Sequence, residues 1–249
     1  MASLSYGKDS LKMIDVIMEK GYPLDKVVHA QIMATPEISA DLPPMQEFKA
    51  QADEILLHRY GIKVEHVHAK KSYEEQFYTV KGERALPKNR GKIYGFPALF
   101  GSWCVGMLKQ SALKTAKKGF SHEYIGYAVD EKNPKRQEKI RDYHDNGHAS
   151  RIFPLVDLNI TEQECFDWCR DNDLLSPIYD NGTRGGCWFC HKQPLPQLRL
   201  LRKNYPALWQ KLLDWDKDDP WGDFNIRYTV AELEERFAQE ESQLSLFDD

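Results

Sequence analysis

Two patterns of apolar and polar residues recur along the chain, one typical of short buried strands and the other of amphipathic helices. Residues 1–4 are mostly apolar. After a polar turn, Leu11, Ile14 and Ile17 follow at the spacing of one helix face. The N-terminus is therefore predicted to form a strand, a turn and a helix.

The same alternation continues through most of the chain. Further strands are predicted at residues 26–33, 64–68, 123–129 and 152–156. Further helices are predicted at residues 44–60, 99–117, 135–146 and 161–170. The last of these helices opens with the capping box Thr161-x-x-Glu164. Strands that alternate with helices predict an α/β fold, a twisted parallel sheet with helices on both faces that binds ligands beyond the carboxyl ends of its strands.

The character of the sequence changes after Gln193, where Leu- and Trp-rich helical segments precede an acidic stretch and a charged tail. We therefore expect one domain over residues 1–192, a C-terminal helical region over 193–241 and a flexible tail over 242–249.

Composition is typical of a cytoplasmic enzyme. The 249 residues are 41% hydrophobic, enough for a sizeable core, and no apolar run or leader predicts a membrane span or secretion. A formal net charge of −4 gives no global signature of nucleic-acid binding. The densest basic cluster is Lys109, Lys114, Lys117 and Lys118. Five cysteines, an odd number, argue against a disulfide framework and for metal-binding or catalytic thiols.

The turn before the first helix has the residues of a phosphate-binding loop. Gly7 lets the backbone approach an oxyanion, and the helix directs N–H groups and its positive dipole end to the same place. Lys8 adds a charge, and Ser5 and Ser10 add hydroxyl donors. The spacing differs from the GxxxxGK[ST] loop. A helix start capped by Ser5 or Asp9 is the alternative interpretation.

The loop sequence Ser-Tyr-Gly-Lys-Asp-Ser resembles the SGGKDS signature of the PP-loop ATP pyrophosphatases, with Tyr6 where that family usually has glycine. This resemblance implies an adenine nucleotide alpha hydrolase-like fold. It also implies binding of ATP or another adenine nucleotide with Mg²⁺, cleavage between the α- and β-phosphates, and adenylation of a substrate. The implied catalytic residues are Lys8 and Asp9. The implied nucleotide-binding residues are Ser5, Tyr6, Gly7, Lys8, Asp9, Ser10, His29 and Gly126. His29 has an alternative interpretation as a partly buried, hydrogen-bonded histidine.

Later motifs resemble the phosphoadenosine phosphosulfate (PAPS) reductase-like branch of that superfamily. Three segments precede a GCxxC sequence in the same order as in that family. They are residues 152–157, the capped helix that begins at 161, and residues 176–182. Gly126 lies where the family carries Gly-x-Arg, but Tyr127 or Ala128 replaces the arginine. The resemblance covers about residues 1–195.

Three cysteines of this chain resemble the four-cysteine iron–sulfur pattern of adenylylsulfate reductases. Trp103 stands where that pattern has its remaining cysteine. The implied metal ligands are Cys104, Cys187 and Cys190. A [4Fe–4S] cluster with one open iron, as in some tRNA thiolases, and Zn²⁺ with a fourth ligand such as His191 both remain open. A buried Cys104 beside a CxxC without function is the third interpretation. Cys165 and Cys169 have the spacing of core residues, with Cys169 as a reserve ligand.

The C-terminal part of the chain bears on function in two ways. There is no cysteine after Cys190, which argues against sulfonucleotide reduction by a C-terminal thiolate. Residues 243–247, Gln-Leu-Ser-Leu-Phe, resemble the peptide that binds the bacterial DNA sliding clamp. The alternative is that these apolar side chains fold back onto the protein.

Several other residues are weaker candidates. Arg136 and Arg151 could contact phosphate, Asp41, Asp130 and Glu131 could bind metal or substrate, and residues 93–97 could stack on a base. Each equally suits a surface or packing role. We expect an ATP-dependent adenylating enzyme for sulfur incorporation into nucleic acid or a related modification of it, with a sulfur donor protein as a further partner. The alternatives are a reductase that uses external thiols and a nucleotide-binding adaptor recruited to DNA by its tail.

Overall fold

Five short strands form one sheet in which every neighbouring pair is parallel. In the computed structural model, which describes residues 1–98, 102–146, 150–179, 186–222 and 224–245, the order across the sheet is β3-β2-β1-β4-β5. The strands are β1 Ala2–Ser3, β2 Val27–Ala30, β3 Val64–Val67, β4 Glu123–Tyr124 and β5 Arg151–Ile152. This confirms the predicted α/β fold with a parallel sheet.

The strand order reverses direction between β1 and β4. From β1 the chain builds outward through β2 to β3, and then returns to place β4 on the other side of β1. At such a switch point the loops after the two central strands diverge, which leaves a crevice at their carboxyl ends. Residues 5–10 follow β1 and residues 125–131 follow β4, so both loops belong to this point.

The chain divides into two compact units. The sheet unit contains Met1–Gln31, Leu42–Ala69 and Lys109–Thr183. The helical unit contains Ile32–Asp41, Lys70–Leu108 and Arg184–Asp249. The segment with the CxxC sequence therefore clusters with the C-terminal helices.

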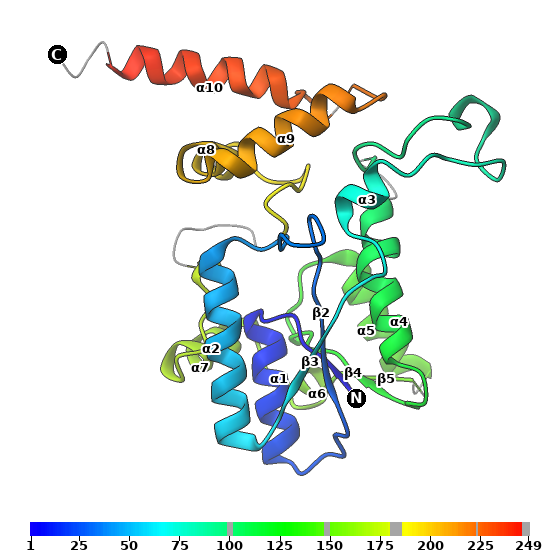
Figure 1. Ribbon diagram of the computed structural model, residues 1–249. Helices are drawn as coiled ribbons and strands as arrows, with labels where there is room; N and C mark the ends of the chain where they lie inside the picture. Colours follow the sequence, from blue (N-terminus) through cyan, green and yellow to red (C-terminus); the bar gives the residue numbers. More distant parts are fainter. Residues whose placement is uncertain (99–101, 147–149, 180–185, 223, 246–249) are drawn as a thin grey trace. The chain divides into compact units, whose positions relative to one another are not determined.

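Helices cover both faces of the sheet, as predicted. Helices α1 and α2 lie on one side, and α4 and α5 lie on the other (Figure 1). Helix α1 packs against α6 and α7, whereas α4 contacts β2 and β3. These helices are α1 Lys8–Glu19, α2 Pro43–Tyr60, α4 Ser111–Ala116, α5 Pro134–Asn146, α6 Pro154–Asp157 and α7 Glu162–Asp171, followed by a 3₁₀ turn, η3 Pro177–Tyr179.

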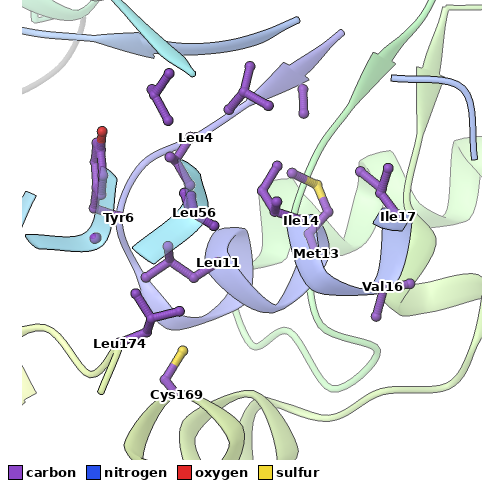
Figure 2. Packing of buried hydrophobic residues seen from close by; sticks show 14 of the residues in the cluster. Leu4, Tyr6, Leu11, Met13, Ile14, Val16, Ile17, Leu56, Cys169 and Leu174 are labelled. Atoms are coloured by element: carbon purple, nitrogen blue, oxygen red, sulfur yellow. The ribbon is translucent and has the colours of Figure 1, made fainter. Parts of the chain in front are cut away.

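The core of the sheet unit forms around the apolar face of α1. Leu11, Ile14 and Ile17 have no exposed surface, which confirms the periodicity read from the sequence. Cys169 and Leu174 approach the same helix from α7 and the segment after it (Figure 2). Cys165 and Cys169 are fully buried in this cluster, so their predicted role as core residues is confirmed.

Some element boundaries differ from the predictions. The strand predicted at 152–156 ends at Ile152, because Pro154 has no backbone N–H to donate and instead starts α6. The strand predicted at 123–129 ends at Tyr124. In the helix predicted at 99–117, a π-helical turn, η2 Val105–Gln110, precedes α4, and residues 99–101 lie outside the described part. The predicted capping box of Thr161 and Glu164 is present.

Short and long helices make up the helical unit. They are α3 Tyr73–Phe77, η1 Pro87–Asn89, α8 Leu195–Asn204, α9 Pro206–Asp218 and α10 Val230–Ser245. Helix α9 packs against both α8 and α10, which confirms the helical C-terminal region. Helix α10 runs to Ser245, further than the expected boundary at 241. Among the helices described, none is both long and apolar enough to cross a membrane.

Candidate functional site

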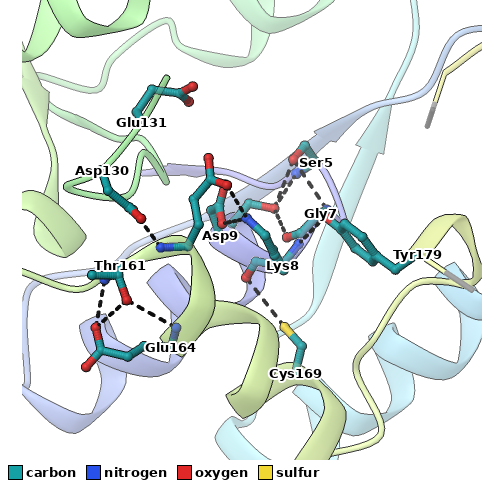
Figure 3. A network of polar contacts seen from close by, with 12 residues as sticks. Ser5, Gly7, Lys8, Asp9, Asp130, Glu131, Thr161, Glu164, Cys169 and Tyr179 are labelled. Atoms are coloured by element: carbon teal, nitrogen blue, oxygen red, sulfur yellow. Dashed lines mark hydrogen bonds and ion pairs between the residues drawn. The ribbon is translucent and has the colours of Figure 1, made fainter. Parts of the chain in front are cut away.

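The loop after β1 presents the N-terminus of α1 at the switch point of the sheet (Figure 3). Gly7 is the N-cap, with φ −84° and ψ 157°, and its carbonyl accepts the amides of Ser10 at 3.0 Å and Leu11 at 3.1 Å. The first N–H groups of a helix have no partner within the helix. The positive end of the α1 dipole therefore faces the loop, an arrangement that favours a bound anion, and anion binding there stays a prediction.

The two serine hydroxyls hold the loop closed. Ser10 Oγ donates to the carbonyl of Gly7 at 2.9 Å and accepts the amide of Ser5 at 3.1 Å. Because the Ser10 hydroxyl proton is used in this way, the Ser5 hydroxyl donates to Ser10 Oγ, 3.0 Å away. These bonds fix the direction in which the loop leaves β1.

Lys8 is the cation of the loop. Its ammonium lies 2.6 Å from a carboxylate oxygen of Asp9 and 3.7 Å from one of Glu162, at the start of α7. Burial lowers the pKa of Lys8, but the hydrogen bond and charge of Asp9 outweigh it, so the pKa is raised overall. The loop therefore holds a permanent positive charge beside a carboxylate that can bind Mg²⁺.

Tyr179 is a loop contact that sequence reasoning did not single out. Its hydroxyl accepts the backbone N–H of Lys8 at 3.3 Å, and burial raises its pKa. A Cβ on Gly7 would lie 3.8 Å from the same hydroxyl. The signal was present, since Tyr179 belongs to the segment 176–182 whose order resembles the reductases. Residues 180–182 lie outside the described residues.

The side chain of Tyr6 points into the core instead of the loop surface. Its backbone is left-handed, with φ +57°, and the residue has no exposed surface. Its hydroxyl donates to Asp53 and lies 3.0 Å from Nε2 of His66. Burial raises the pKa of Tyr6, and the bond to Asp53 adds to the shift. The loop can therefore take a conformation that favours glycine because burial and hydrogen bonds offset the strain.

His29 is a buried histidine with partners on both ring nitrogens, which agrees with its alternative interpretation. Its Nε2 lies 2.8 Å from the ammonium of Lys49, and its Nδ1 lies 2.9 Å from the carbonyl of Leu4. An ammonium can only donate, so Nε2 accepts and Nδ1 carries the proton that it donates to Leu4. His29 therefore anchors the end of β1 directly before the loop.

Gly126 contacts the loop through its backbone. A Cβ at this position would lie 2.7 Å from the carbonyl oxygen of Asp9 and 2.8 Å from Cα of Ser10. No side chain fits at that separation. Gly126 therefore lets the loop after β4 approach the first turn of α1.

The nearby carboxylates have structural partners. Asp130 accepts the N–H of Glu162 at 2.7 Å and thereby caps α7. Glu131 is buried and pairs with Arg136 at 2.7 Å, while Arg136 also lies over the ring of Tyr127. These contacts give the candidates a structural role in holding the loop after β4. Of the remaining weak candidates, Arg151 is exposed in β5, and Asp41 lies in the helical unit.

The three predicted metal ligands all belong to the helical unit. Burial raises the pKa of Cys187, and the charges of Cys190 and Cys104 raise it further. The pKa of Cys104 is raised as well, first by burial and then by the charge of Cys190. The thiols are therefore near enough for a charge on one to oppose ionisation of another. Trp103, at the place of the fourth cysteine, stacks on Tyr73 with a ring separation of 5.0 Å.

The thiols are not assembled as a ready ligand set. Among the described residues, no three His, Cys, Asp or Glu side chains are grouped so that they could hold a metal ion. The metal-binding role of Cys104, Cys187 and Cys190 therefore stays a prediction. One observation does suit a bound group. The hydroxyl of Tyr73 is buried beside these thiols and has no hydrogen-bond partner in the described structure.

The remaining predicted surfaces are only partly described. In the basic cluster, Lys117 pairs with Glu123, while Lys114 and Lys118 are exposed. In the clamp-like peptide, residues 243–245 form the end of α10, and Leu246 and Phe247 lie outside the described residues.

Comparison with solved structures finds proteins of similar fold, among them the following two. One is a phosphoadenylyl-sulfate (PAPS) reductase from Candida auris in its phosphate complex, with a TM-score of 0.47 and 15% identity over 78% of this chain and 82% of that chain. The other is the U34-tRNA thiolase NcsA from Methanococcus maripaludis with its [4Fe-4S] cluster, with a TM-score of 0.38 and 17% identity over 87% of this chain and 70% of that chain. No protein-family model and no curated protein sequence matches the chain.

Proposed function

We propose that this chain is an ATP-dependent adenylating enzyme that binds the pyrophosphate part of the nucleotide at Ser5–Ser10. The observation that carries the proposal is the position of Lys8 at the N-terminus of α1, at the switch point of a parallel sheet. That position combines a full positive charge, the positive end of a helix dipole and the crevice where such sheets bind ligands.

The reaction transfers the adenylyl group to an oxygen of the acceptor. A bond forms between that oxygen and the α-phosphorus, and the bond to the oxygen that bridges the α- and β-phosphates breaks. Pyrophosphate leaves with the electron pair of the broken bond. Lys8 and the positive end of the α1 dipole stabilise the negative charge that develops on it, because they are in place before the charge appears.

Asp9 has the chemistry to bind the Mg²⁺ that accompanies ATP. Its carboxylate contacts Lys8 at 2.6 Å, so phosphate binding to Lys8 must compete with this contact. Mg²⁺ would bind oxygen ligands of Asp9 and the phosphates together and would neutralise part of their charge. Lys8 then remains available to the departing pyrophosphate.

The second half of the proposed reaction is displacement of AMP by a sulfur nucleophile, with nucleic acid as the acceptor. Cys104, Cys187 and Cys190 would hold a [4Fe–4S] cluster, or Zn²⁺ in the alternative. Thiolates are the ligands that both prefer. When bound, the cluster supplies an iron that can carry sulfide. The partnerless hydroxyl of Tyr73 supplies a hydrogen-bond donor for sulfur.

Two other functions remain as alternatives. A PAPS or adenylylsulfate reductase would need an external thiol, since the chain has no cysteine after Cys190. A nucleotide-binding adaptor would bind ATP without cleaving it. Both alternatives predict that the purified chain releases no pyrophosphate from ATP.

Pyrophosphate release from ATP, measured with candidate acceptors present, tests the proposal. Lys8→Met should abolish release, and Lys20→Met is the matched control because Lys20 is exposed at the other end of α1. Release that depends on Lys8 but not on Lys20 supports adenylation. ATP binding without release supports the adaptor instead.

Recruitment by the bacterial sliding clamp is a separate part of the proposal and rests on the sequence of residues 243–247. Apolar anchors in a short peptide bind such pockets through a few large side chains. Leu246→Ala with Phe247→Ala should abolish binding to purified clamp, whereas Glu241→Ala should leave it unchanged. Equal binding by the wild type, the double variant and Glu241→Ala would remove the clamp from the proposal.

A further inference from the structure

An aromatic pocket opens within the helical unit. Its volume is about 490 Å³, within the range of small-ligand sites, about 300–1,000 Å³. Lys81, Asn89 and Asn225 contribute polar groups to its lining. The aromatic rings that line it are Tyr94, Phe96, Trp103, Trp221 and Phe224.

A basic arm, residues 79–94, forms one side of this pocket. Its two limbs pair antiparallel. The amide of Lys81 donates to the carbonyl of Lys92 at 2.8 Å, and the amide of Tyr94 donates to the carbonyl of Thr79 at 3.0 Å. In Figure 1 it is the long loop that follows α3. The arm carries one carboxylate, Glu83, and five cations, Lys81, Arg84, Lys88, Arg90 and Lys92.

Within the described part of the chain, no ion pair neutralises the charges of the basic arm, although the charge of Asp219 acts on Lys81. The ion pairs found in the described part of the chain involve none of its five cations. Arg84 and Lys88 are exposed. The ammonium groups of Lys81 and Lys92 lie 4.1 Å and 4.9 Å from the ring of Trp221. Positive charge therefore meets the aromatic surface at the pocket.

One carboxylate near the pocket has a structural explanation. Asp219 accepts the amides of Phe96, Trp221 and Gly222 at 2.9, 3.2 and 2.9 Å. These three bonds hold the turn that carries Trp221 against Gly95, where a Cβ would lie 2.6 Å from the Trp221 ring. Asp219 therefore positions the aromatic wall, and its charge is already met by backbone donors.

We infer that the pocket and the basic arm bind a single strand of nucleic acid, with an unpaired base in the pocket and the flanking phosphates on the arm. Aromatic rings next to cations are the combination that such strands require, because bases stack on the rings and phosphates pair with the cations. A base in a duplex is stacked on both of its faces and paired along one edge, so it cannot enter the pocket. The inference rests on the proposed function, because it names the class of acceptor for that reaction. Binding of the strand can nevertheless be measured without catalysis.

Fluorescence anisotropy with a labelled 12-nucleotide DNA strand, without ATP, tests the inference. Arg84→Glu with Lys88→Glu should weaken binding about tenfold at 0.15 M salt, because two phosphate contacts are lost. The charge-matched control, Lys114→Glu on α4 with Lys118→Glu directly after that helix, should change binding less than threefold. A strand of equal charge whose bases are removed should bind about fivefold more weakly or worse. An RNA strand of the same sequence shows which sugar is preferred.

Three results would overturn the inference: no binding of either strand, equal losses in the two double variants, or equal binding of the base-free strand. Circular dichroism of each variant checks that it is folded. Lys8→Met separates this inference from the proposed function, since it should bind the strand normally while releasing no pyrophosphate. Strand binding by a wild-type chain that never releases pyrophosphate would refute the proposed function alone.

Discussion

The backbone of Gly126 lies against the backbone of Asp9, so close that a Cβ at position 126 would come within 2.7 Å of the Asp9 carbonyl oxygen. This contact joins the loops that follow the two central strands of the sheet. It fixes the first turn of α1, where Lys8 lies, relative to the loop after β4.

Gly126→Ala should therefore destabilise the protein, because backbone on the opposite side cannot move aside as a side chain can. We expect the free energy of unfolding to fall by about 1–3 kcal/mol, measured by urea denaturation. Gly82→Ala is the control, since a Cβ there meets nothing within 4 Å. Equal effects of the two substitutions would contradict the role given to Gly126.

Tyr6→Phe should cost about 1 kcal/mol of unfolding free energy, because it removes the hydroxyl that bonds to Asp53 and His66. Tyr22→Phe is the control, because the described structure shows no hydrogen bond from the Tyr22 hydroxyl. Tyr6→Gly should cost more, about 3 kcal/mol or above, although it relieves the left-handed backbone. A glycine variant as stable as wild type would show that the buried ring contributes little.

The buried thiols should make stability fall at alkaline pH. Burial raises the pKa of Cys169 to about 12, so the folded chain holds a proton that the unfolded chain releases above about 9. The contribution is complete below pH 9 and is lost between 9 and 12, by about 1.4 kcal/mol per pH unit. Denaturation at pH 8 and pH 10 should show a smaller loss in Cys169→Ala than in wild type. Parallel losses would contradict this assignment.

Removal of the Tyr73 hydroxyl should not destabilise the metal-free protein. Because this buried hydroxyl has no partner in the described structure, Tyr73→Phe should leave the unfolding free energy unchanged or raise it by about 1 kcal/mol. Tyr78→Phe, which loses a 2.7 Å bond to Asp218, is the contrasting variant. A clear loss of stability in Tyr73→Phe alone would mean that its hydroxyl does have a partner.

Iron and acid-labile sulfide in anaerobically purified protein should decide the nature of the thiol site. About four of each per chain, absent from Cys187→Ala and present in Cys165→Ala, would support the three-thiolate cluster. One zinc without sulfide would support the alternative. Chain without bound metal in both forms would agree with the observation that the described residues form no ligand set.

The elements that sequence analysis predicted best are those with a local cause. Helix α1 follows from the spacing of Leu11, Ile14 and Ile17, and α7 follows from its capping box. Strands β4 and β5 are only two residues long, too short for a period to show their ends. The inward direction of Tyr6 depends on a single positive φ and on partners far away in sequence, which no local pattern contains.

Candidate residues divide in the same way. The loop at Ser5–Ser10 was found because a strand, a turn and a helix are adjacent in sequence. Tyr179 was missed because its contact with Lys8 joins residues 171 positions apart. Residues 93–97, singled out in the sequence as able to stack on a base, contribute Tyr94, Phe96 and Pro97 to the pocket of the helical unit. The rest of the pocket was missed for the same reason as Tyr179, since Trp221 and residues 224–226 come from far along the chain.

The interleaving of the two units constrains how the chain can fold during synthesis. The chain passes between the units at residues 31/32, 41/42, 69/70, 108/109 and 183/184. All segments of the sheet unit have been synthesised by Thr183, whereas the helical unit lacks its largest segment until the C-terminal helices are made. The aromatic residues of its earlier segments, such as Tyr73 and Phe77, therefore wait for Trp215 before they are covered. Premature termination after residue 183 should yield a chain that aggregates or requires a chaperone.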